Sequence, residues 1–237
     1  MGIIKHISFD LYGTLIKSHP LYKTSRADEI SRIILTESGL YFPPRDIINY
    51  IQEYKNILCN NQIATGFHKE NFEETVSGMV KHIVSKEYNK LYHINFENTI
   101  YRTIDALNKL AELYPVKPLY TDIPEILGNI KRRTNVSFSI LSNTGLIPGK
   151  HINIGLFECG IKNLMDFILY SDEIGLTKPN QKAFKLISDN SNLKPQEILF
   201  VGDRRNINGK CQLSNMAYYH IDNKITSLRT LNYILSK

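Results

Sequence analysis

The strongest constraint on the fold is a regular alternation of short apolar runs and amphipathic segments after residue 117. The apolar runs predict strands, and the segments between them, with apolar residues every three or four positions, predict helices. Strands that alternate with helices pair in parallel through right-handed crossovers. We therefore expect an α/β fold with a doubly wound, three-layer parallel sheet. The expected strands are 136–141, 166–170, 197–201 and 216–221, and the expected helices are 121–135, 151–159, 180–188 and 225–235.

A further apolar run, residues 3–9, lies at the start of the chain and ends at a carboxylate. Asp10 follows it directly, and Gly13 and Thr14 then indicate a tight turn. Open α/β sheets keep their sites at the carboxyl ends of strands, where an aspartate can act as a covalent nucleophile. A turn or helix-capping role is the commoner use of such a residue in proteins at large.

Residues 18–116 lack this alternation and contain amphipathic helical stretches instead. Their apolar residues recur at i, i+3 and i+4, as Val76, Met79 and Val80 illustrate. We therefore expect a helical bundle domain over 18–116, inserted into an α/β core made of 1–17 and 117–237. Its helices are expected at 25–38, 44–59, 69–87 and 96–113, and its hinges at 19–26 and 114–118.

The charge of the chain favours a small anionic partner over nucleic acid. A net charge of +6 results from 29 basic and 23 acidic residues, and the basic residues are spread along the chain. The densest group, Lys131 to Arg133, falls at the end of an expected helix, where cations complement the helix dipole. We therefore expect no nucleic-acid partner, while the modest positive field favours a small anionic substrate.

Membrane and disulfide signals are also missing from the sequence. No run reaches the ~18 to 20 apolar residues needed to cross a bilayer, and the N-terminus has no secretory leader pattern. We therefore expect a soluble, cytoplasmic protein with no membrane partner. Cys59, Cys159 and Cys211 are odd in number and lack metal-ligand spacing, which predicts free thiols. The sequence does not determine the oligomeric state.

Four short motifs occur in order at the ends of expected strands or in the loops beyond them. They are Asp10-Leu11-Tyr12-Gly13-Thr14-Leu15, Ser142-Asn143-Thr144, Lys178-Pro179 and Gly202-Asp203. In this order they resemble the four motifs of the haloacid dehalogenase-like (HAD) hydrolase superfamily. The resemblance covers 1–17 and 117–237 and implies a Rossmann-like core. It also makes 18–116 similar to the helical cap that closes over the catalytic loop in this superfamily, excludes water and sets specificity.

The resemblance implies a role for each motif residue. Asp10 would be the catalytic nucleophile, and Lys178 would orient it and balance the charge around it. Thr14, Ser142 and Asn143 would bind the oxygens of the substrate. Taken alone, Ser142 and Asn143 are typical of an ordinary turn, and Lys178 is typical of a solvated surface residue.

The resemblance also implies Mg²⁺ as the cofactor. In the superfamily the first aspartate, the main-chain carbonyl two residues on and acids of the fourth motif hold the metal. Here these positions are Asp10, Tyr12 and Asp203, with Asn208 in place of the second acid of the fourth motif. An amide oxygen can be a ligand but brings no charge, so we expect weakened metal affinity.

Tyr12 is the second departure from the superfamily pattern. HAD phosphatases carry an aspartate there, which protonates the leaving group and later activates the hydrolytic water. A phenol with a pKa of ~10 is a poor base near neutral pH. Because general acid and base assistance is worth ~100- to 10,000-fold, we expect slow turnover of unactivated phosphate monoesters.

Three functions remain open from the sequence. The first is a Mg²⁺-dependent, phosphatase-like hydrolase of a small phosphorylated metabolite. The second is a metal-independent hydrolase similar to the 2-haloacid dehalogenases, which share the Asp-Leu-Tyr-Gly-Thr-Leu string and hold the leaving halide with an arginine; Arg26, Arg32 and Arg45 are available. The third is a catalytically silent protein of this fold that binds a ligand or partner, because Tyr12 and Asn208 depart from the active pattern.

Overall fold

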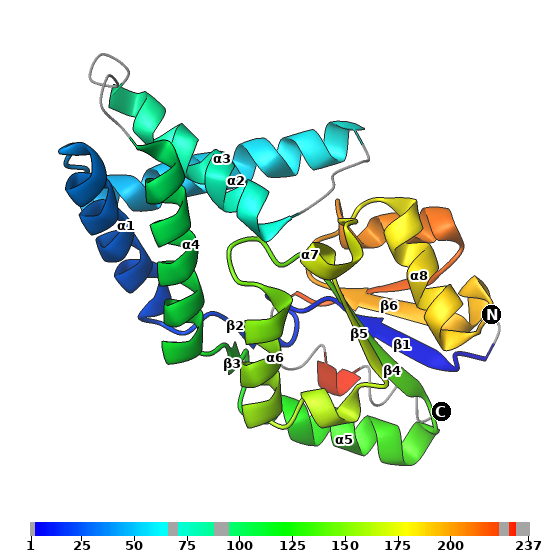
Figure 1. Ribbon diagram of the computed structural model, residues 1–237. Coiled ribbons are helices and arrows are strands. Elements are labelled where there is room, and N and C mark those ends of the chain that lie inside the picture. Colours follow the sequence, from blue (N-terminus) through cyan, green and yellow to red (C-terminus); the bar gives the residue numbers. More distant parts are fainter. Residues whose placement is uncertain (1–2, 66–70, 88–94, 223–227, 231–237) are drawn as a thin grey trace.

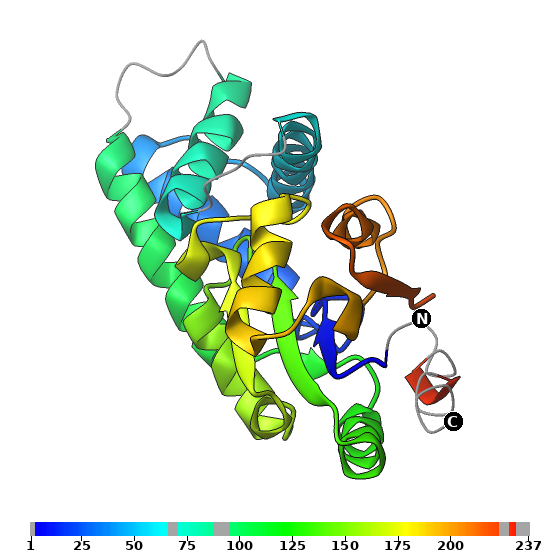
Figure 2. The same ribbon diagram turned by 90° about the vertical axis from the view of Figure 1, so that its right-hand side faces the viewer.

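A five-stranded parallel sheet forms the centre of the α/β core, with strand order β5-β4-β1-β6-β7. The computed structural model describes residues 3–65, 71–87, 95–222 and 228–230 (Figures 1 and 2). The strands are β1 (His6–Phe9), β4 (Ser137–Ser142), β5 (Phe167–Tyr170), β6 (Ile198–Gly202) and β7 (Ala217–His220). The expected doubly wound α/β fold is therefore confirmed, and each expected strand is found to within a few residues.

Strand β1 lies in the centre of the sheet because its residues form a continuous run that is buried on both faces of the sheet. All four of its residues are buried, as are all five of β6. Such runs are typical of parallel sheets that helices cover on both sides. β1 lies between β4 and β6, in register Phe9 to Ile140 on one side and Phe9 to Val201 on the other. The chain therefore leaves β1 in the middle of the carboxyl edge of the sheet.

Helices cover the two faces of the sheet and form separate buried clusters with it. One cluster joins the sheet to α5 and α6, and the other joins it to α8 and the 3₁₀ helix η4. Figure 1 shows α8 on one side of the sheet and α5 on the other. The helices of the core are α5 (Ile123–Thr134), α6 (Gly149–Glu158), α7 (Ser171–Ile174), α8 (Gln181–Ser191) and the 3₁₀ helices η2 (Lys162–Leu164), η3 (Pro195–Glu197) and η4 (Asn208–Ser214).

Four helices between β2 and β3 pack around a buried cluster of their own. They are α1 (Tyr22–Ser38), α2 (Pro44–Thr65), α3 (Phe72–Val84) and α4 (Phe96–Leu113). Figure 1 shows them together, away from the sheet. The predicted apolar stripes form this cluster, with Ile30, Ile47, Val76 and Leu107 fully buried in it. We propose that residues 18–116 form a cap domain on the core of 1–17 and 117–237.

The boundaries of these helices differ from the expected ones in local detail. α1 begins at Tyr22, inside the segment 19–26 that was expected to be a hinge, and α3 is shorter than the expected 69–87. Local capping explains some of these limits: Gly39 ends α1 in the left-handed region, and Asn71 begins α3 by accepting a hydrogen bond from the main-chain N–H of Glu73. The segments between these helices are too short to show a periodic pattern, so the sequence did not predict every helix boundary.

A short antiparallel ladder joins the two chain segments that connect the core and the four helices. It pairs β2 (Ile16–Lys17) with β3 (Lys117–Pro118), and Leu119 donates a further hydrogen bond from its N–H to the carbonyl of Leu15. Neither strand was expected, because two-residue strands carry no periodicity. The ladder holds the two connecting segments side by side.

Three smaller expectations have mixed outcomes. Cys59, Cys159 and Cys211 are free thiols, as expected. Within the described ranges, no helix has both the length and the apolar character that crossing a membrane requires. Of the helix expected at 225–235, residues 228–230 are helical, and the remainder lies outside the described residues.

Candidate active site

The motif residues meet at the carboxyl edge of the sheet because their strands are neighbours there. Asp10 follows β1, Asn143 follows β4 and Asp203 follows β6. The main-chain N–H of Asp10 donates to the carbonyl of Val201 over 2.8 Å, which continues the ladder and fixes where the Asp10 side chain leaves the sheet. Segments more than a hundred residues apart in the sequence thus form one loop cluster.

Asp10 is a buried carboxylate held by three donors. It is 8% exposed. Its Oδ1 accepts hydrogen bonds from the Lys178 ammonium at 2.6 Å and the Leu11 N–H at 2.7 Å, and its Oδ2 accepts one from the Asn208 amide at 2.8 Å. Burial by itself would raise the pKa of Asp10, but Lys178 and these hydrogen bonds hold it below the ordinary value. Asp10 is therefore ionised at neutral pH.

Lys178 is held in place through its main chain by Asn143. Lys178 is 2% exposed. The Asn143 side-chain amide donates to the carbonyl of Lys178 and accepts from its N–H, both over 2.9 Å. This paired contact fixes the loop between β5 and α8 against the loop after β4. The side chain of Asn143 is thus engaged with Lys178, while the predicted contact of Asn143 with substrate oxygens concerns its main-chain N–H and stays a prediction.

Asn208 connects the two carboxylates of the site. It is fully buried, and its Nδ2 donates to Asp10 Oδ2 at 2.8 Å and to Asp203 Oδ1 at 3.4 Å. A Cβ atom at Gly202 would overlap the Asn208 amide, so the glycine before Asp203 is what allows this approach. Burial, together with the negative charge of Asp10, raises the pKa of Asp203 to about 6.

The donor set fits a divalent cation with fewer acids than the superfamily pattern provides. Among the described residues, no group of three or more His, Cys, Asp or Glu side chains is placed to hold a metal. Two features favour a cation nevertheless. Burial is the main cause of the raised pKa of Asp203, and repulsion from Asp10, which a cation would relieve, is the second. In addition, Asn208 Oδ1 is buried with no hydrogen-bond partner in the described structure. Oxygen donors of this kind suit Mg²⁺.

Tyr12 and Thr14 lie in the turn after Asp10, and both hydroxyls are buried. Neither hydroxyl oxygen has a hydrogen-bond partner among the described residues. Burial, with a smaller contribution from Tyr22, raises the pKa of Tyr12 above its already high ordinary value, so the phenol stays protonated. Thr14 is fully buried and does not line the pocket beside Tyr12.

Ser142, the other predicted substrate-binding residue, is buried at the end of β4. Its hydroxyl makes a long 3.4 Å contact to the carbonyl of Asn143. The next residue, Thr144, has its N–H engaged by the Ser171 hydroxyl at 2.9 Å. The structure brings Ser142 into the loop cluster, and Asn143 and Thr144 continue from it into the pocket.

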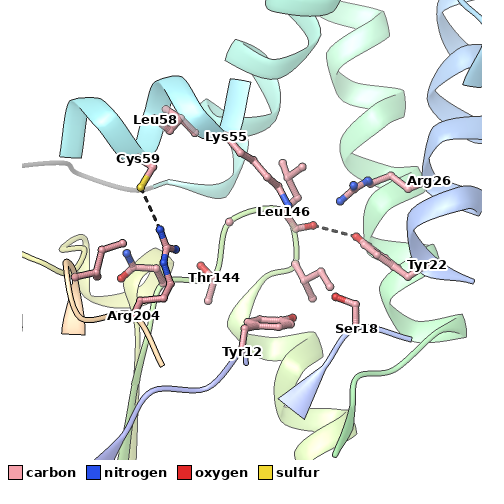
Figure 3. Close-up of a pocket in the computed structure, with 14 residues that line it drawn as sticks. Tyr12, Ser18, Tyr22, Arg26, Lys55, Leu58, Cys59, Thr144, Leu146 and Arg204 are labelled. Carbon is pink, nitrogen blue, oxygen red and sulfur yellow. Dashed lines mark hydrogen bonds between the residues drawn. The ribbon is translucent and has the colours of Figure 1, made fainter. Parts of the chain in front are cut away.

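A pocket of about 350 Å³ lies between the catalytic loops and helices α1 and α2. Figure 3 shows Tyr12 and Thr144 on the core side, with side chains from α1 and α2 facing them. Its lining includes three cations, which are Arg26, Lys55 and Arg204. Arg204 also donates to the thiol of Cys59 on α2 at 3.3 Å, a contact between the core and the helices.

The structure distinguishes among the three arginines that the sequence left equivalent. Arg26 is 6% exposed and lines the pocket. Arg32 pairs with Glu29 on the surface of α1, and Arg45 is exposed at the start of α2. Lys55 and Arg204 were not singled out from the sequence. No local pattern marks them, because their position in the pocket depends on how α2 packs against the core.

Comparisons with known proteins agree with this geometry. The sequence model of the family described as haloacid dehalogenase-like hydrolase matches residues 4–208. The chain is 26% identical over 206 residues to the (S)-2-haloacid dehalogenase of Pseudomonas sp. (strain YL), covering 85% of this chain and 75% of that protein. It is 23% identical over 202 residues to the phosphoglycolate phosphatase of Haemophilus influenzae (strain 86-028NP), covering 85% and 78%.

A solved structure shows the same fold. The magnesium-bound HAD-hydrolase YfnB from Bacillus subtilis superposes with a TM-score of 0.65 and 16% sequence identity, over 100% of both chains. At this identity the likeness concerns the fold. The two curated relatives have different activities, so neither one alone assigns a substrate.

Proposed function

Because this chain belongs to the haloacid dehalogenase-like hydrolase family, we propose that it hydrolyses small phosphomonoesters with Asp10 as the nucleophile. The observation that carries the proposal is the state of Asp10. A buried carboxylate kept ionised by an ammonium at 2.6 Å, two residues before Tyr12 in the lining of a pocket that contains three cations, is suited to attack an anionic electrophile.

The proposed reaction has two steps, each with a displacement at phosphorus. A carboxylate oxygen of Asp10 attacks phosphorus, the ester P–O bond breaks, and its electron pair stays on the leaving oxygen, which takes up a proton. Water then attacks the phosphorus of the aspartyl phosphate, which releases inorganic phosphate and restores Asp10. Oδ1 accepts two hydrogen bonds and Oδ2 accepts one from Asn208, so Oδ2 has the greater free lone-pair capacity for the attack.

Lys178 and the Asn208 amide would stabilise the negative charge at Asp10 and at the phosphoryl group in both steps. Each already contacts Asp10, so little reorganisation is needed when charge moves from the carboxylate to the phosphoryl oxygens. Mg²⁺, held by Asp10, Asp203, the Tyr12 carbonyl and Asn208, would neutralise the phosphoryl oxygens when bound. With two acidic ligands instead of three, we expect weak Mg²⁺ binding.

Tyr12 limits the range of productive substrates. Its phenol keeps its proton and so cannot serve as the base for the attacking water. A leaving group that needs no proton escapes part of this handicap. We therefore expect aryl phosphates, whose phenols leave as stable anions, to be cleaved faster than alkyl phosphates.

The test is hydrolysis of p-nitrophenyl phosphate by the full chain with Mg²⁺ and with a chelator. We expect Mg²⁺-dependent turnover that Asp10→Asn reduces by about a thousandfold or more. Asp189→Asn is a matched control, because Asp189 forms an exposed ion pair with Lys185 on α8 and neither residue lines the pocket beside Tyr12. Equal activity of the wild type and Asp10→Asn, with both folded, would exclude this proposal and favour the silent member of the fold.

A second candidate is a metal-independent hydrolase of 2-haloacids. It is favoured by Tyr12, since halide needs no proton on leaving, and by Arg26, which is buried in the pocket beside Tyr12 where a leaving anion could be received. Release of chloride from 2-chloropropionate that a chelator does not affect, together with no cleavage of p-nitrophenyl phosphate, would select this reaction over the phosphatase.

A further inference from the structure

The pocket beside the catalytic loops has an unbalanced charge. Arg26, Lys55 and Arg204 line it, and none of the lining residues in the described structure is Asp or Glu. Figure 3 shows the Arg26 and Lys55 side chains converging from α1 and α2 above the loop that carries Leu146. A concentration of cations without acids at a concave surface indicates an anionic ligand.

Arg26 is buried, and it forms no ion pair with the described residues. Its guanidinium carbon lies 5.5 Å from the ring centroid of Tyr22, and the Tyr22 hydroxyl is itself fixed by donating to the carbonyl of Leu146 at 3.0 Å. The Nε of Arg26 is buried with no hydrogen-bond partner in the described structure. Because a buried cation is costly unless it is paired, this arrangement is built for an anion that comes from outside the chain.

Lys55 adds a second positive charge from the neighbouring helix. The residue as a whole is exposed, and its side chain lines the pocket. Desolvation, with repulsion from Arg26 and Lys23, lowers the pKa of Lys55 to about 8. An anion placed at the two cations would relieve their repulsion and keep Lys55 charged.

Two residues that line the pocket, Tyr12 and Asn143, connect it to Asp10 and Lys178, which do not line it themselves. Tyr12 lies two residues after Asp10, and Asn143 clamps the main chain of Lys178. A substrate whose phosphoryl group lies at Asp10 would therefore extend past Tyr12 toward α1 and α2. The volume of about 350 Å³ suits a small molecule, and two of the three cations, Arg26 and Lys55, come from helices α1 and α2.

We propose that Arg26 and Lys55 form a subsite for a second anionic group, so that the preferred substrates are small phosphomonoesters that also carry a carboxylate or a second phosphoryl group. This inference rests on the proposed phosphatase function. It assigns substrate selection to helices α1 and α2, while the reaction itself belongs to the loops of the core.

The test compares three aryl phosphates that differ only in their distal group. These are 4-(hydroxymethyl)phenyl phosphate, which has a neutral distal group, 4-carboxyphenyl phosphate and 4-(phosphonomethyl)phenyl phosphate. We expect kcat/KM for at least one anionic ester to exceed that of the neutral ester by about tenfold or more, as charge-assisted contacts predict. The two anionic esters show which distal group the subsite prefers. Equal kcat/KM for all three would overturn the proposal.

Matched variants connect this preference to the two cations. Arg26→Gln and Lys55→Gln are each expected to bring the anionic-to-neutral ratio of kcat/KM close to one. Lys23→Gln removes the same charge from an exposed position on α1 that does not line the pocket, and is expected to retain the ratio. If Arg26→Gln does not fold, Lys55→Gln still decides, because Lys55 is an exposed residue. A ratio that neither pocket variant changes would contradict the proposal.

Binding separates this inference from the proposed function. Calorimetric titration of the three esters into Asp10→Asn needs no turnover. If the wild type hydrolyses none of them, yet Asp10→Asn binds an anionic ester more tightly and the added Arg26→Gln substitution removes that preference, the phosphatase function fails and the subsite stands. Equal binding of all three esters would reject the subsite, whether or not the wild type is active.

Discussion

At the scale of single residues, the site depends on how a few polar side chains are paired. Asp10 and Lys178 were assigned together from motif order, and the structure brings them to 2.6 Å. The Asn143 side chain has a role that the sequence did not predict, because its amide bonds main-chain atoms of a residue 35 positions away, which no local pattern reveals. The sequence motifs therefore locate Asp10, Lys178 and Asn143, but not the contact by which Asn143 holds the main chain of Lys178.

Asn143 is expected to act on the reaction by positioning Lys178. Asn143→Ala removes both hydrogen bonds to the Lys178 main chain. We expect kcat for p-nitrophenyl phosphate to fall by about a hundredfold, because small displacements of a catalytic group have effects of that size. Asn180→Ala in the same loop removes the N-cap of α8, in which the Asn180 side chain accepts a hydrogen bond from the Lys182 N–H at 2.9 Å. It should cost about 1 kcal/mol of stability with a much smaller change in kcat.

Comparing Asn143→Ala with Asn180→Ala distinguishes a loss of Lys178 positioning from a general destabilisation of the loop. If Asn180→Ala lowers kcat as much as Asn143→Ala does, the clamp on Lys178 has no special role. Asn143→Asp keeps the acceptor for the Lys178 N–H and loses the donor to its carbonyl, so an intermediate kcat is the expected result.

His6 makes folding sensitive to acid. Its ring bridges the hydroxyls of Ser137 and Ser139 at 2.6 and 2.7 Å, and burial lowers its pKa from 6.5 to about 4, against an opposing effect of Asp166. Below pH 6.5 the unfolded chain binds a proton that the folded protein does not. Stability from this group is therefore lost as pH falls from about 6.5 to about 4.

Denaturant titrations at pH 7 and pH 5 measure this effect. We expect the wild type to lose roughly 2 kcal/mol of unfolding free energy through His6 over that interval. His6→Gln cannot take up the proton, so its loss between the two pH values should be smaller by that amount. An identical pH dependence of the two proteins would show that His6 is protonated equally in the folded and unfolded states.

At the scale of elements, periodicity predicted the strands and most helices, and it failed where elements are short or set by packing. β2 and β3 have two residues each, and α1 begins at Tyr22 inside an expected hinge. Some glycines inside helices mark close contacts that the periodicity of the sequence does not predict. Gly155 in α6 lies directly against Val116, next to β3, which no sequence pattern indicated.

Gly155 and Gly128 provide a prediction about helix packing. A Cβ atom at Gly155 would lie 2.6 Å from the side chain of Val116 and 2.8 Å from its carbonyl oxygen. We expect Gly155→Ala to lower the free energy of unfolding by about 1–3 kcal/mol through overpacking. At Gly128 in α5 the nearest such atom, on Arg132, is 3.5 Å away, so Gly128→Ala should raise stability by about 0.5–1 kcal/mol. Thermal unfolding of both variants checks the contrast, which equal shifts would contradict.

At the scale of the whole molecule, the pocket is lined both by loops of the α/β core and by the helices inserted between β2 and β3. The alternation after residue 117 predicted the core, and the absence of alternation in 18–116 predicted the helices. Which helix faces turn toward the catalytic loops could not be predicted, because amphipathic stripes identify buried faces and not the residues around a cavity. Arg26 and Lys55 therefore became recognisable as neighbours only in the folded structure.

The central claim is that Asp10 forms a covalent bond to the group that is transferred. The direct measurement is borohydride trapping during steady-state hydrolysis of p-nitrophenyl phosphate, followed by peptide mass spectrometry. Borohydride reduces an aspartyl phosphate to homoserine, so the account predicts homoserine at position 10 when substrate and Mg²⁺ are both present, and unmodified Asp10 when substrate is omitted. Steady turnover with Asp10 unmodified, or with the label on another carboxylate, would contradict it.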